Sequence, residues 1–458
     1  MIISVNNSKV TITNPSHILI SELKTIFTFK DKSKDYQLSK MAKNPYFKNS
    51  KAYFQLMKEI NICLLEENED SISFPAPLLY LTDLVPNVDD RKETGSPISL
   101  PWVSQSKAIK LRDYQKLVID KCLVNNRGII NMATGLGKSK TAIFLLRELK
   151  KKALIVAPNK SIANQLYSEL CDVFGKQRIG FYGSGKKKLG DITVGIAQTV
   201  TNHVEDFKKA DLGVVIVDES HHCAATTFYT ILNGLADVGR IYGLTATAYR
   251  SDGKDLLLNA ACGHLLVEYD AKWGIENGHL AKPIFIMRNI KTNAQDFSDK
   301  LLAYKSHILS ANEITNQIES DARKMIQAKK STLIIVDSIA HGEKLSKALG
   351  VPFMCGEDKK SSDYVDQLNN LSIPALVATE GACSEGVDTR VIECLIMGQF
   401  TAAKGAVLQA VGRGLRKQDD KTHCIILDYN PISSKMLSRH ANKRLQYYAE
   451  ISDQIKIV

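Results

Sequence analysis

The sequence predicts an α/β fold in which two parallel sheets follow one another, preceded by a small α+β domain. Continuous apolar runs rich in β-branched residues alternate with helical patterns over residues 104–270, and the alternation returns over residues 283–458. Apolar runs of this kind are typical of strands buried on both faces of a sheet. A chain of 458 residues is long enough for about three domains. We therefore expect domains at 1–98, 104–270 and 283–458.

Each parallel sheet is expected to contain at least five apolar strands. Those of the first sheet are Ile129–Ile130, Ala153–Ala157, Ile192–Ile196, Val214–Val217 and Ile241–Leu244. Those of the second sheet are Ile284–Ile286, Leu333–Val336, Ala375–Ala378, Cys394–Met397 and Cys424–Leu427. In the first domain, Val10–Thr13 and Tyr53–Met57 indicate short strands and helices. The glycine-flanked run Lys186–Lys188 predicts a loop, which either contacts phosphate or is simply solvated.

The first domain, residues 1–98, is expected to be a small accessory unit that binds DNA. Between Met1 and Ile60, ten lysines and no arginine face four acidic residues, a local net charge of +6, with seven aromatic residues interleaved. Lysines bind phosphates and aromatic rings stack on exposed bases. The alternative is that these rings form the core of the domain. An acidic stretch and a linker ending near Pro101 close the domain.

The composition favours an intracellular protein with a polyanionic partner. The 60 Lys and Arg residues exceed the 49 Asp and Glu residues by 11, and the pI is near 9.0. This excess favours nucleic acid or an acidic membrane surface, although scattered solvated lysines give the same balance. The nine cysteines form no C-x-x-C pair, which argues against a zinc site or a disulfide framework. No signal peptide or membrane span is recognisable, so we expect a cytoplasmic protein.

The segment Ala133–Ser139, Ala-Thr-Gly-Leu-Gly-Lys-Ser, predicts a phosphate-binding loop between a strand and a helix. Its small residues let backbone N–H groups turn onto the phosphates of a nucleotide at the positive end of the helix. Lys138 would reach the outer phosphates and Ser139 would ligate Mg2+. Met132 stands where the usual pattern has its first glycine, so an ordinary strand-to-helix turn is the alternative. The predicted nucleotide contacts of the loop are Thr134, Gly135, Gly137, Lys138 and Ser139.

Two further groups of charged residues complete the predicted chemistry. Asp218 and Glu219 follow an apolar strand; the first would hold Mg2+ through water, and the second would orient and deprotonate the attacking water. Arg413 and Arg416 lie three positions apart and share a face if the segment is helical. They would neutralise charge on the transferring phosphoryl group, unless they form only a basic turn. Since only the first sheet carries a phosphate loop, the nucleotide is expected in the cleft between the sheets.

Taken in chain order, the motifs resemble the complete series of a superfamily 2 helicase of the DExH kind. They are Leu111–Gln115, Ala133–Ser139, Ala157–Asn159 with Gln165, Ala197–Thr199, Asp218–His221, Thr245–Thr247, Ala378–Glu380 with Glu385–Asp388, and Gln409–Arg416. The resemblance covers residues 104–428 and implies two tandem RecA-like domains. Within the superfamily, the compact length, residues 247–253 and the basic first domain are most similar to phage UvsW-like helicases, which remodel branched DNA.

The resemblance also implies roles for individual residues. Gln115 would read the adenine edge with support from Arg112, Asp388 would lie near the ribose, and Arg416 would be the arginine finger beside Arg413. His221 and Gln409 would couple the two sheets, and Thr245 and Thr247 would sense the nucleotide. The nucleic-acid contacts would be Asn159, Gln198, Thr199 and Thr379, whose short polar groups suit phosphate oxygens and sugars.

We therefore expect an ATP- and Mg2+-dependent DNA helicase that acts on branched DNA, or on duplex with single-stranded regions, in recombination, repair or replication. A monomer without a membrane partner is expected, in the host cytoplasm if the protein is encoded by a phage. One alternative is an RNA helicase, because phosphate-tracking motifs do not separate the two sugars. Another is a nucleotide-gated nucleic-acid-binding protein that does not unwind processively.

Overall fold

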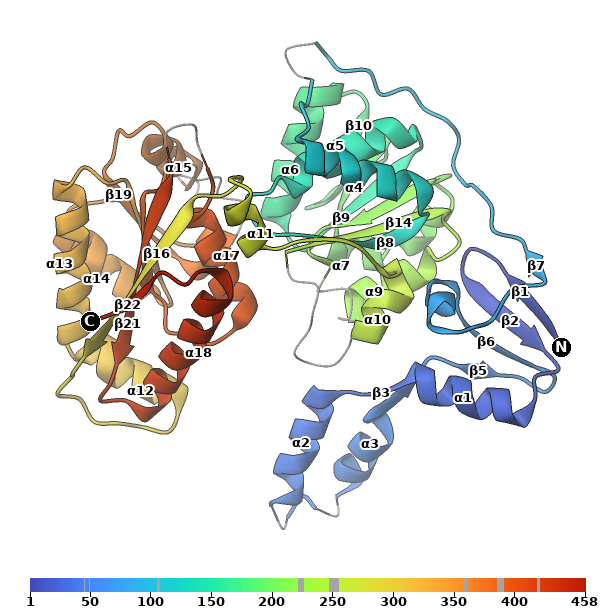
Figure 1. Cartoon of the computed structure of the whole chain (residues 1–458), viewed down its shortest axis with the longest axis horizontal. Coiled ribbons are helices and arrows are strands. Elements are labelled where there is room, and N and C mark those ends of the chain that lie inside the picture. The colour runs from blue at the N-terminus through green and yellow to red at the C-terminus, as the bar shows by residue number, and fades with distance from the viewer. Residues whose placement is uncertain are drawn as a thin grey trace. The chain divides into compact units, whose positions relative to one another are not determined.

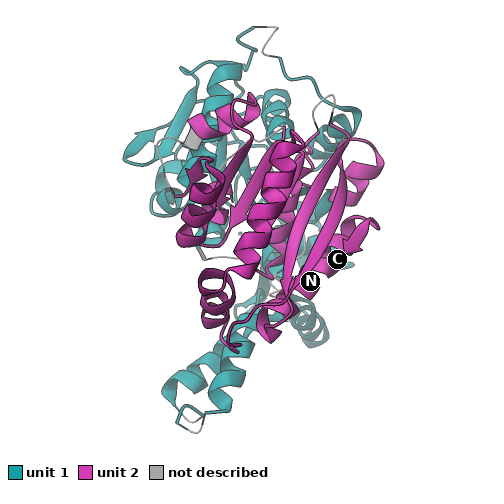
Figure 2. Cartoon of the chain, turned by 90° about the vertical axis from the view of Figure 1, so that its left-hand side faces the viewer, with its two compact units in different colours: residues 1–132, 138–268 teal, residues 133–137, 269–458 magenta. Residues whose placement is uncertain are grey.

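The computed structural model describes residues 1–44, 46–48, 50–104, 108–220, 226–246, 255–356, 361–384, 391–417 and 421–458. The chain forms two compact units, which Figure 2 distinguishes by colour. Unit 1 comprises Met1–Met132 and Lys138–Glu268, and unit 2 comprises Ala133–Gly137 and Tyr269–Val458. Each unit contains one large sheet of mainly parallel strands, and unit 1 also contains a smaller mixed sheet. The predicted α/β fold class is confirmed.

The N-terminal part of unit 1 is a mixed sheet in the order β5-β6-β2-β1-β7 (Figure 1). Its strands are β1 (Ile2–Val5), β2 (Lys9–Thr13), β5 (Glu66–Glu67), β6 (Ser71–Pro75) and β7 (Val88–Asp89). The first four pair antiparallel, whereas β7 joins β1 in parallel. Helix α1 (His17–Phe27) buries Leu23 and Phe27 in the core of this sheet, and the Phe27 ring lies 4.6 Å from that of Phe74. A 3-10 helix, η1 (Ala76–Leu81), buries Leu78 in the same core.

A helical arm, defined here as Thr28–Cys63, extends from the mixed sheet (Figure 1). Strands β3 (Thr28–Lys30) and β4 (Asn61–Cys63) pair antiparallel and form its stalk. Beyond them lie α2 (Lys32–Ala42) and α3 (Lys51–Glu59), whose N-caps are Asp31 and Ser50.

The large sheet of unit 1 has the strand order β11-β10-β12-β9-β13-β14-β8-β15. The strands are β8 (Arg127–Met132), β9 (Ala153–Ala157), β10 (Ile179–Gly183), β11 (Lys186–Lys188), β12 (Ile192–Ile196), β13 (Val214–Val217), β14 (Arg240–Thr245) and β15 (Leu265–Tyr269). The strands from β10 to β8 in this order pair in parallel, and β11 is antiparallel to β10. All five predicted strands are present. The predicted loop at Lys186–Lys188 is wrong, because these residues form an edge strand.

Helices cover both faces of this sheet (Figure 1). One face carries α4 (Asp113–Val124), α5 (Lys138–Leu149) and α6 (Lys160–Phe174); the other carries α7 (Ala197–Thr201), α8 (Val204–Lys208), α9 (Thr226–Gly234) and α10 (Asp255–Cys262). Leu154 and Val156 of β9 pack in the core beneath α7–α10, whereas Ile155 between them is buried on the other side. Side chains alternate between the faces of a strand, so burial of both sets produces the continuous apolar runs seen in the sequence.

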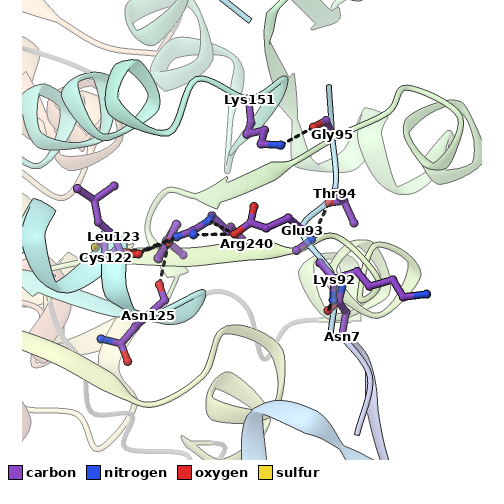
Figure 3. A network of polar contacts seen from close by, with 12 residues as sticks. Asn7, Lys92, Glu93, Thr94, Gly95, Cys122, Leu123, Asn125, Lys151 and Arg240 are labelled. Atoms are coloured by element: carbon purple, nitrogen blue, oxygen red, sulfur yellow. Dashed lines mark hydrogen bonds and ion pairs between the residues drawn. The ribbon is translucent and has the colours of Figure 1, made fainter. Parts of the chain in front are cut away.

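The predicted linker between the two sheets of unit 1 is a strap that lies along the large sheet (Figure 3). Glu93 forms an ion pair with Arg240 at 2.7 Å. The hydroxyl of Thr94 donates to the carbonyl of Leu212 at 2.8 Å and accepts from the N–H of Gly239 at 2.8 Å. Asn7 donates from Nδ2 to the carbonyls of Lys92 and Asp237 at 2.9 Å, which ties the mixed sheet to the same region.

Unit 2 contains a parallel sheet in the order β18-β19-β17-β20-β21-β16-β22. Its strands are β16 (Lys282–Ile290), β17 (Thr332–Val336), β18 (Phe353–Met354), β19 (Ala375–Thr379), β20 (Cys394–Gly398), β21 (His423–Pro431) and β22 (Ile455–Ile457). Its helices are α11 (Ala271–Glu276), α12 (Lys300–Tyr304), the π-helix η4 (Lys305–Ser310), α13 (Glu313–Gln327), α14 (Ile339–Leu349), α15 (Ser361–Asn369), α16 (Glu380–Ser384), α17 (Lys404–Gly414) and α18 (Lys435–Ile451). The five strands predicted for this half are all present.

The helices of unit 2 also lie on both faces of its sheet. Helices α13 and α14 share a core with the inner side chains of β17 and β19. On the other face, the ring of Phe285 in β16 stacks on Tyr448 of α18 at 4.3 Å. Across the described residues, the structure contains no helix with both the length and the apolar character needed to cross a membrane.

A buried histidine should make unit 2 sensitive to acid. His341 in α14 is fully buried, and its Nε2 lies 3.5 Å from the hydroxyl of Thr315, while its Nδ1 has no hydrogen-bond partner among the described residues. Burial, with a smaller contribution from Lys344, lowers the pKa of His341 to about 4. An unfolded histidine has a pKa near 6.5, so between these values the unfolded state binds the additional proton and stability falls as the pH drops.

We expect His341 to reduce the free energy of unfolding by about 2 kcal/mol between pH 7 and pH 5. Urea denaturation at both pH values measures the decrease in the free energy of unfolding from pH 7 to pH 5. This decrease should be about 2 kcal/mol smaller in His341→Leu than in the unaltered protein. An equal loss in both proteins would contradict the prediction. His307 is a second buried histidine, and burial lowers its pKa as well, so the comparison rests on the difference between the two proteins.

Candidate functional site at the strand ends of the first large sheet

Three predicted catalytic residues of unit 1 and the predicted coupling residue Thr245 lie at the carboxyl ends of three neighbouring strands. Lys138 comes after β8, Thr245 is the last residue of β14, and Asp218 and Glu219 follow β13. The sheet order places β13, β14 and β8 side by side, and all three run in parallel. Because the carboxyl ends of parallel strands meet at one edge, the sheet gathers these side chains there, the usual position of a ligand site in such folds.

The phosphate-loop segment has the backbone conformation that its glycines predict. Gly135 and Gly137 have φ angles of +92° and +86°, in the left-handed region that favours glycine. Lys138 begins α5, and its Nζ donates to the carbonyl of Met132 at 3.1 Å. The segment thus ends at the N-terminus of a twelve-residue helix, where free N–H groups and the helix dipole favour anions.

Met132, which replaces the expected first glycine, is the last residue of β8 and is fully buried. Its side chain therefore belongs to the core of the sheet. The chain enters the loop one residue later, at Ala133, so the methionine leaves the left-handed turns at Gly135 and Gly137 unaffected.

The two predicted carboxylates lie on a tight turn with an unusual backbone. The N–H of Asp218 donates to the carbonyl of Val156 at 3.0 Å, which continues the ladder between β13 and β9. Its Oδ1 accepts the N–H of Glu219 at 3.0 Å. Glu219 has a φ of +51°, and such a conformation costs roughly 1–3 kcal/mol in a residue other than glycine. Strain of this kind is found at functional sites, and the position at the carboxyl end of β13 makes Glu219 a candidate for one.

The predicted adenine-reading residues lie at the beginning of α4. Gln115 is buried, and its Oε1 accepts the backbone N–H of Arg112 at 2.9 Å. The amide therefore stabilises the first turn of the helix, whatever else it contacts. The side chain of Arg112 is exposed and its Nη1 lies 3.4 Å from the hydroxyl of Tyr114. Recognition of adenine by this pair stays a prediction.

Three predicted nucleic-acid contacts lie at the same edge of the sheet, beside the carboxylates. Asn159 follows β9, and Gln198 and Thr199 follow β12 in α7. The order β12-β9-β13 places these residues next to the strand that carries Asp218. Gln198 is exposed, and Asn159 accepts the N–H of Ile162 at 3.0 Å as the N-cap of α6. One half of this edge thus carries Lys138 and the two carboxylates, and the other half carries Asn159, Gln198 and Thr199.

In unit 2, Gln409 and Arg413 lie on α17, and Arg413 is buried with 8% of its surface exposed. Arg413 and Arg416 do not share a helix, because α17 ends at Gly414. Arg416 instead forms an antiparallel bridge with Leu280. Beside this bridge, the N–H of Ala281 donates to the carbonyl of Leu415 at 2.8 Å.

The segment Ala133–Gly137 belongs to unit 2 and packs against the residues around Gly412 and Arg416. A Cβ atom on Gly135 would lie 3.2 Å from Cγ of Arg416, and one on Gly412 would lie 2.7 Å from Cβ of Thr134. Both glycines therefore permit a close approach that a side chain would obstruct. Ala133–Gly137 and Arg416 are therefore neighbours within unit 2.

Of the remaining predicted residues, one lies at the end of a strand and three lie outside the described residues. Thr379 ends β19, and its hydroxyl accepts the N–H of Ala382 at 3.3 Å at the start of α16. His221, Thr247 and Asp388 lie outside the described residues.

Arg444, which was not predicted as a site residue, contacts the segment that leads into α17. Arg444 is fully buried and forms two hydrogen bonds to Asp428, at 2.7 and 2.8 Å. Its Nη1 donates to the carbonyl of Thr401 at 3.2 Å, between β20 and α17. A signal was present, because Arg444 lies three residues after Ala441 and four before Tyr448, on the apolar face of α18.

Comparisons with known proteins agree with these observations. Residues 108–250 match the family model "Type III restriction enzyme, res subunit". The chain is 26% identical over 362 residues to the "Putative ATP-dependent helicase IRC3" of Saccharomyces cerevisiae, which covers 71% of this chain and 52% of that protein. It is 23% identical over 401 residues to the "ATP-dependent DNA helicase uvsW" of Enterobacteria phage T4, which covers 80% of this chain and 79% of that protein. The chain thus spans about half the length of the yeast relative.

Among solved structures, "S. cerevisiae Dbp5 bound to RNA and ADP BeF3" aligns over 77% of this chain and 91% of its own, with a TM-score of 0.57 and 12% identity. At this identity the likeness shows a common fold. The predicted resemblance, including the similarity to the T4 protein, is confirmed. The ordered motifs, the family match over residues 108–250 and these relatives together show that the chain is similar to helicases of superfamily 2.

Proposed function

We propose that the chain is an ATP-dependent DNA helicase or translocase that acts on branched DNA, such as forks and junctions, in recombination, repair or replication. The observation that carries this proposal is the carboxyl edge of the first large sheet. There the phosphate loop and carboxylates adjoin Asn159, Gln198 and Thr199 on neighbouring strands. Helicases of superfamily 2 use ATP, typically with Mg2+. The names of the T4 and yeast relatives support the same activity.

The side chains at this edge have the chemistry that hydrolysis of ATP requires. Lys138 would bind the outer phosphates, and Glu219 would orient the attacking water and accept its proton. The hydroxyl of Ser139 and the carboxylate of Asp218 are oxygen ligands that suit Mg2+, which when bound would offset the negative charge of the phosphates. Arg413 and Arg416 would stabilise the charge that develops on the transferring group.

Nucleotide contacts outside these groups are proposed for Thr134, Gly135, Gly137, Arg112, Gln115 and Asp388. Coupling between the nucleotide and the nucleic acid is proposed for His221, Thr245, Thr247 and Gln409. Asn159, Gln198, Thr199 and Thr379 would follow the backbone of one strand, so movement would be largely independent of sequence. Binding and hydrolysis of ATP would favour different states of the protein and shift its grip on that strand.

Each predicted domain would have a distinct task. Residues 104–270 and 283–458 would form the RecA-like motor, and residues 1–98 would contact DNA beside it. We propose that the protein works as a monomer in the cytoplasm, which would be the host's if the protein comes from a phage.

Measurement of ATP hydrolysis with different polymers tests this function. We expect four-way junctions, forked duplexes and single-stranded DNA to stimulate ATP hydrolysis by the unaltered protein. The Glu219→Gln variant should show no stimulated hydrolysis under the same conditions. Stimulation by RNA alone would overturn the DNA assignment in favour of an RNA helicase. No stimulation by any polymer would favour a nucleotide-gated binding protein instead.

A further inference from the structure

The helical arm, Thr28–Cys63, exposes apolar surface that the described part of the chain does not cover. Neither α2 nor α3 has a buried residue. By contrast, α1, directly before the arm, buries Leu23 and Phe27 in the core of the mixed sheet. The arm therefore adds little to the core of unit 1, and its surface is available to a partner.

Aromatic rings dominate the exposed apolar surface of the arm. The described residues of the whole chain include five exposed aromatic side chains, and four of these lie on the arm. Tyr46 and Phe47, between the two helices, have 92% and 50% of their surface exposed. Tyr36 and Phe54 are exposed on α2 and α3. Aromatic residues in soluble proteins are usually buried, so this concentration indicates a binding surface.

The positive charge of the arm favours an anionic partner. The arm has eight lysines and three acidic residues, a net charge of +5. All three acids are engaged within the arm: Asp31 caps α2, Asp35 pairs with Lys30 at 2.8 Å, and Glu59 pairs with Lys34 at 2.7 Å. The other six lysines form no ion pair with a described residue: Lys32, Lys40, Lys43, Lys48, Lys51 and Lys58.

The mixed sheet, from which the arm extends, is attached to the part of unit 1 that contains the first large sheet at several points. The stalk continues directly from the mixed sheet, because Leu64 donates its N–H to the carbonyl of Phe27 at 3.0 Å. Ala260 of α10 packs in the core of that sheet, and the hydroxyl of Tyr80 accepts a hydrogen bond from Asn259 at 3.0 Å. The strap in Figure 3 adds the contacts of Asn7 and Glu93. The arm is therefore mounted on the unit that carries the predicted carboxylates.

We propose that the arm is a second nucleic-acid site, which contacts the branch point of the DNA. Its lysines bind backbone phosphates, and the rings of Tyr46 and Phe47 stack on bases that are unpaired where strands diverge. This inference rests on the proposed function and adds the element that distinguishes branched from linear DNA. Four of the five large apolar side chains exposed on the arm are aromatic, and stacking on bases uses aromatic faces. Together with the lysines that form no ion pair, these rings favour nucleic acid over an acidic lipid surface.

The test compares the affinities of the full chain for a forked DNA, a linear duplex and a single strand, in equilibrium titrations. The double variant Tyr46→Ala/Phe47→Ala should bind the fork roughly 10- to 100-fold more weakly. Affinity for the linear duplex should change less than twofold. The conservative variant Tyr46→Phe should retain the affinity for the fork, because it preserves the stacking face.

The contribution of the lysines is measured through its dependence on salt. Lys43→Ala/Lys48→Ala/Lys51→Ala should lower the slope of log affinity against log salt by up to about 3 for the fork. A matched control is Lys347→Ala/Lys443→Ala/Lys456→Ala, which removes three exposed lysines outside the arm and should leave the slope unchanged.

The outcomes separate this inference from the proposed function. If the unaltered protein binds no nucleic acid, the proposed function fails. If it binds the fork and both arm variants bind equally well, only the arm proposal is overturned. The same holds if the variants lose affinity for phosphatidylserine vesicles but keep their affinity for DNA.

Discussion

Replacement of Lys138 by alanine is expected to reduce ATP turnover by roughly 10²- to 10³-fold, the loss that follows removal of one preorganised donor from a transition-state site. In the structure, Nζ of Lys138 lies 3.1 Å from the carbonyl of Met132, so the ammonium already spans the loop that would hold the phosphates. An alanine cannot supply that positive charge. Steady-state hydrolysis with saturating DNA measures the effect, and DNA binding at low salt should be largely preserved.

Lys140→Ala is the matched control for this substitution. Lys140 lies on the same helix, two residues further on, and its side chain is exposed. The change in net charge is identical, so turnover within about twofold of the unaltered protein would assign the effect to the position of Lys138. Retained turnover in Lys138→Ala would show that the phosphate site lies elsewhere.

Ten strands of the two large sheets could be predicted because each contains a run of apolar residues. Others could not, and β10 shows one physical reason. β10 (Ile179–Gly183) contains two glycines, which weaken any strand signal. A Cβ on Gly180 would lie 2.4 Å from the carbonyl of Lys188, so the glycine permits a close approach of the neighbouring backbone. A local pattern cannot show this requirement, because the partner is a separate segment of the chain.

Lys186–Lys188 is a second strand that the local sequence pattern does not predict. Three consecutive lysines predict a solvated loop, yet they form β11 at the edge of the large sheet. All three are exposed, and lysine on an edge strand discourages pairing with another chain. The polar composition reflects the edge position, which the sequence does not reveal.

The candidate site was predictable where chemistry and local structure coincide. Gly135 and Gly137 have the left-handed backbone that glycine favours, so the conformation of this loop could be predicted from the sequence. Gln115 and Asn159 instead stabilise helix termini, a task that their sequence context cannot separate from ligand binding. The end of α17 before Arg416 depends on the bridge to Leu280, which is distant in sequence.

The helical arm shows why aromatic residues are ambiguous in a sequence. Seven rings within sixty residues fit a core as well as a binding surface. The structure divides them: Phe27 is fully buried, whereas Tyr36, Tyr46, Phe47 and Phe54 are exposed. Exposure, which only the fold determines, converts a compositional feature into a candidate site.

Replacement of Arg416 by alanine is expected to lower kcat for ATP hydrolysis by roughly 10³- to 10⁵-fold, the range found for arginine fingers. Arg416 packs beside the phosphate-loop segment, where a Cβ on Gly135 would lie 3.2 Å from its Cγ. Charge on the transferring group increases in the transition state, so the loss should appear in kcat with little change in KM for ATP.

Arg416→Lys and Lys417→Ala distinguish a finger from a general electrostatic effect. Lysine keeps the charge but not the planar fork of donors, so Arg416→Lys should recover only part of the rate. Lys417 is exposed and donates to the carbonyl of Gly278 at 2.9 Å, so its removal should change kcat less than twofold. If Arg416→Ala keeps its kcat while Arg413→Ala loses it, the finger is the buried arginine of α17. If neither variant loses rate, neither Arg413 nor Arg416 contributes to hydrolysis.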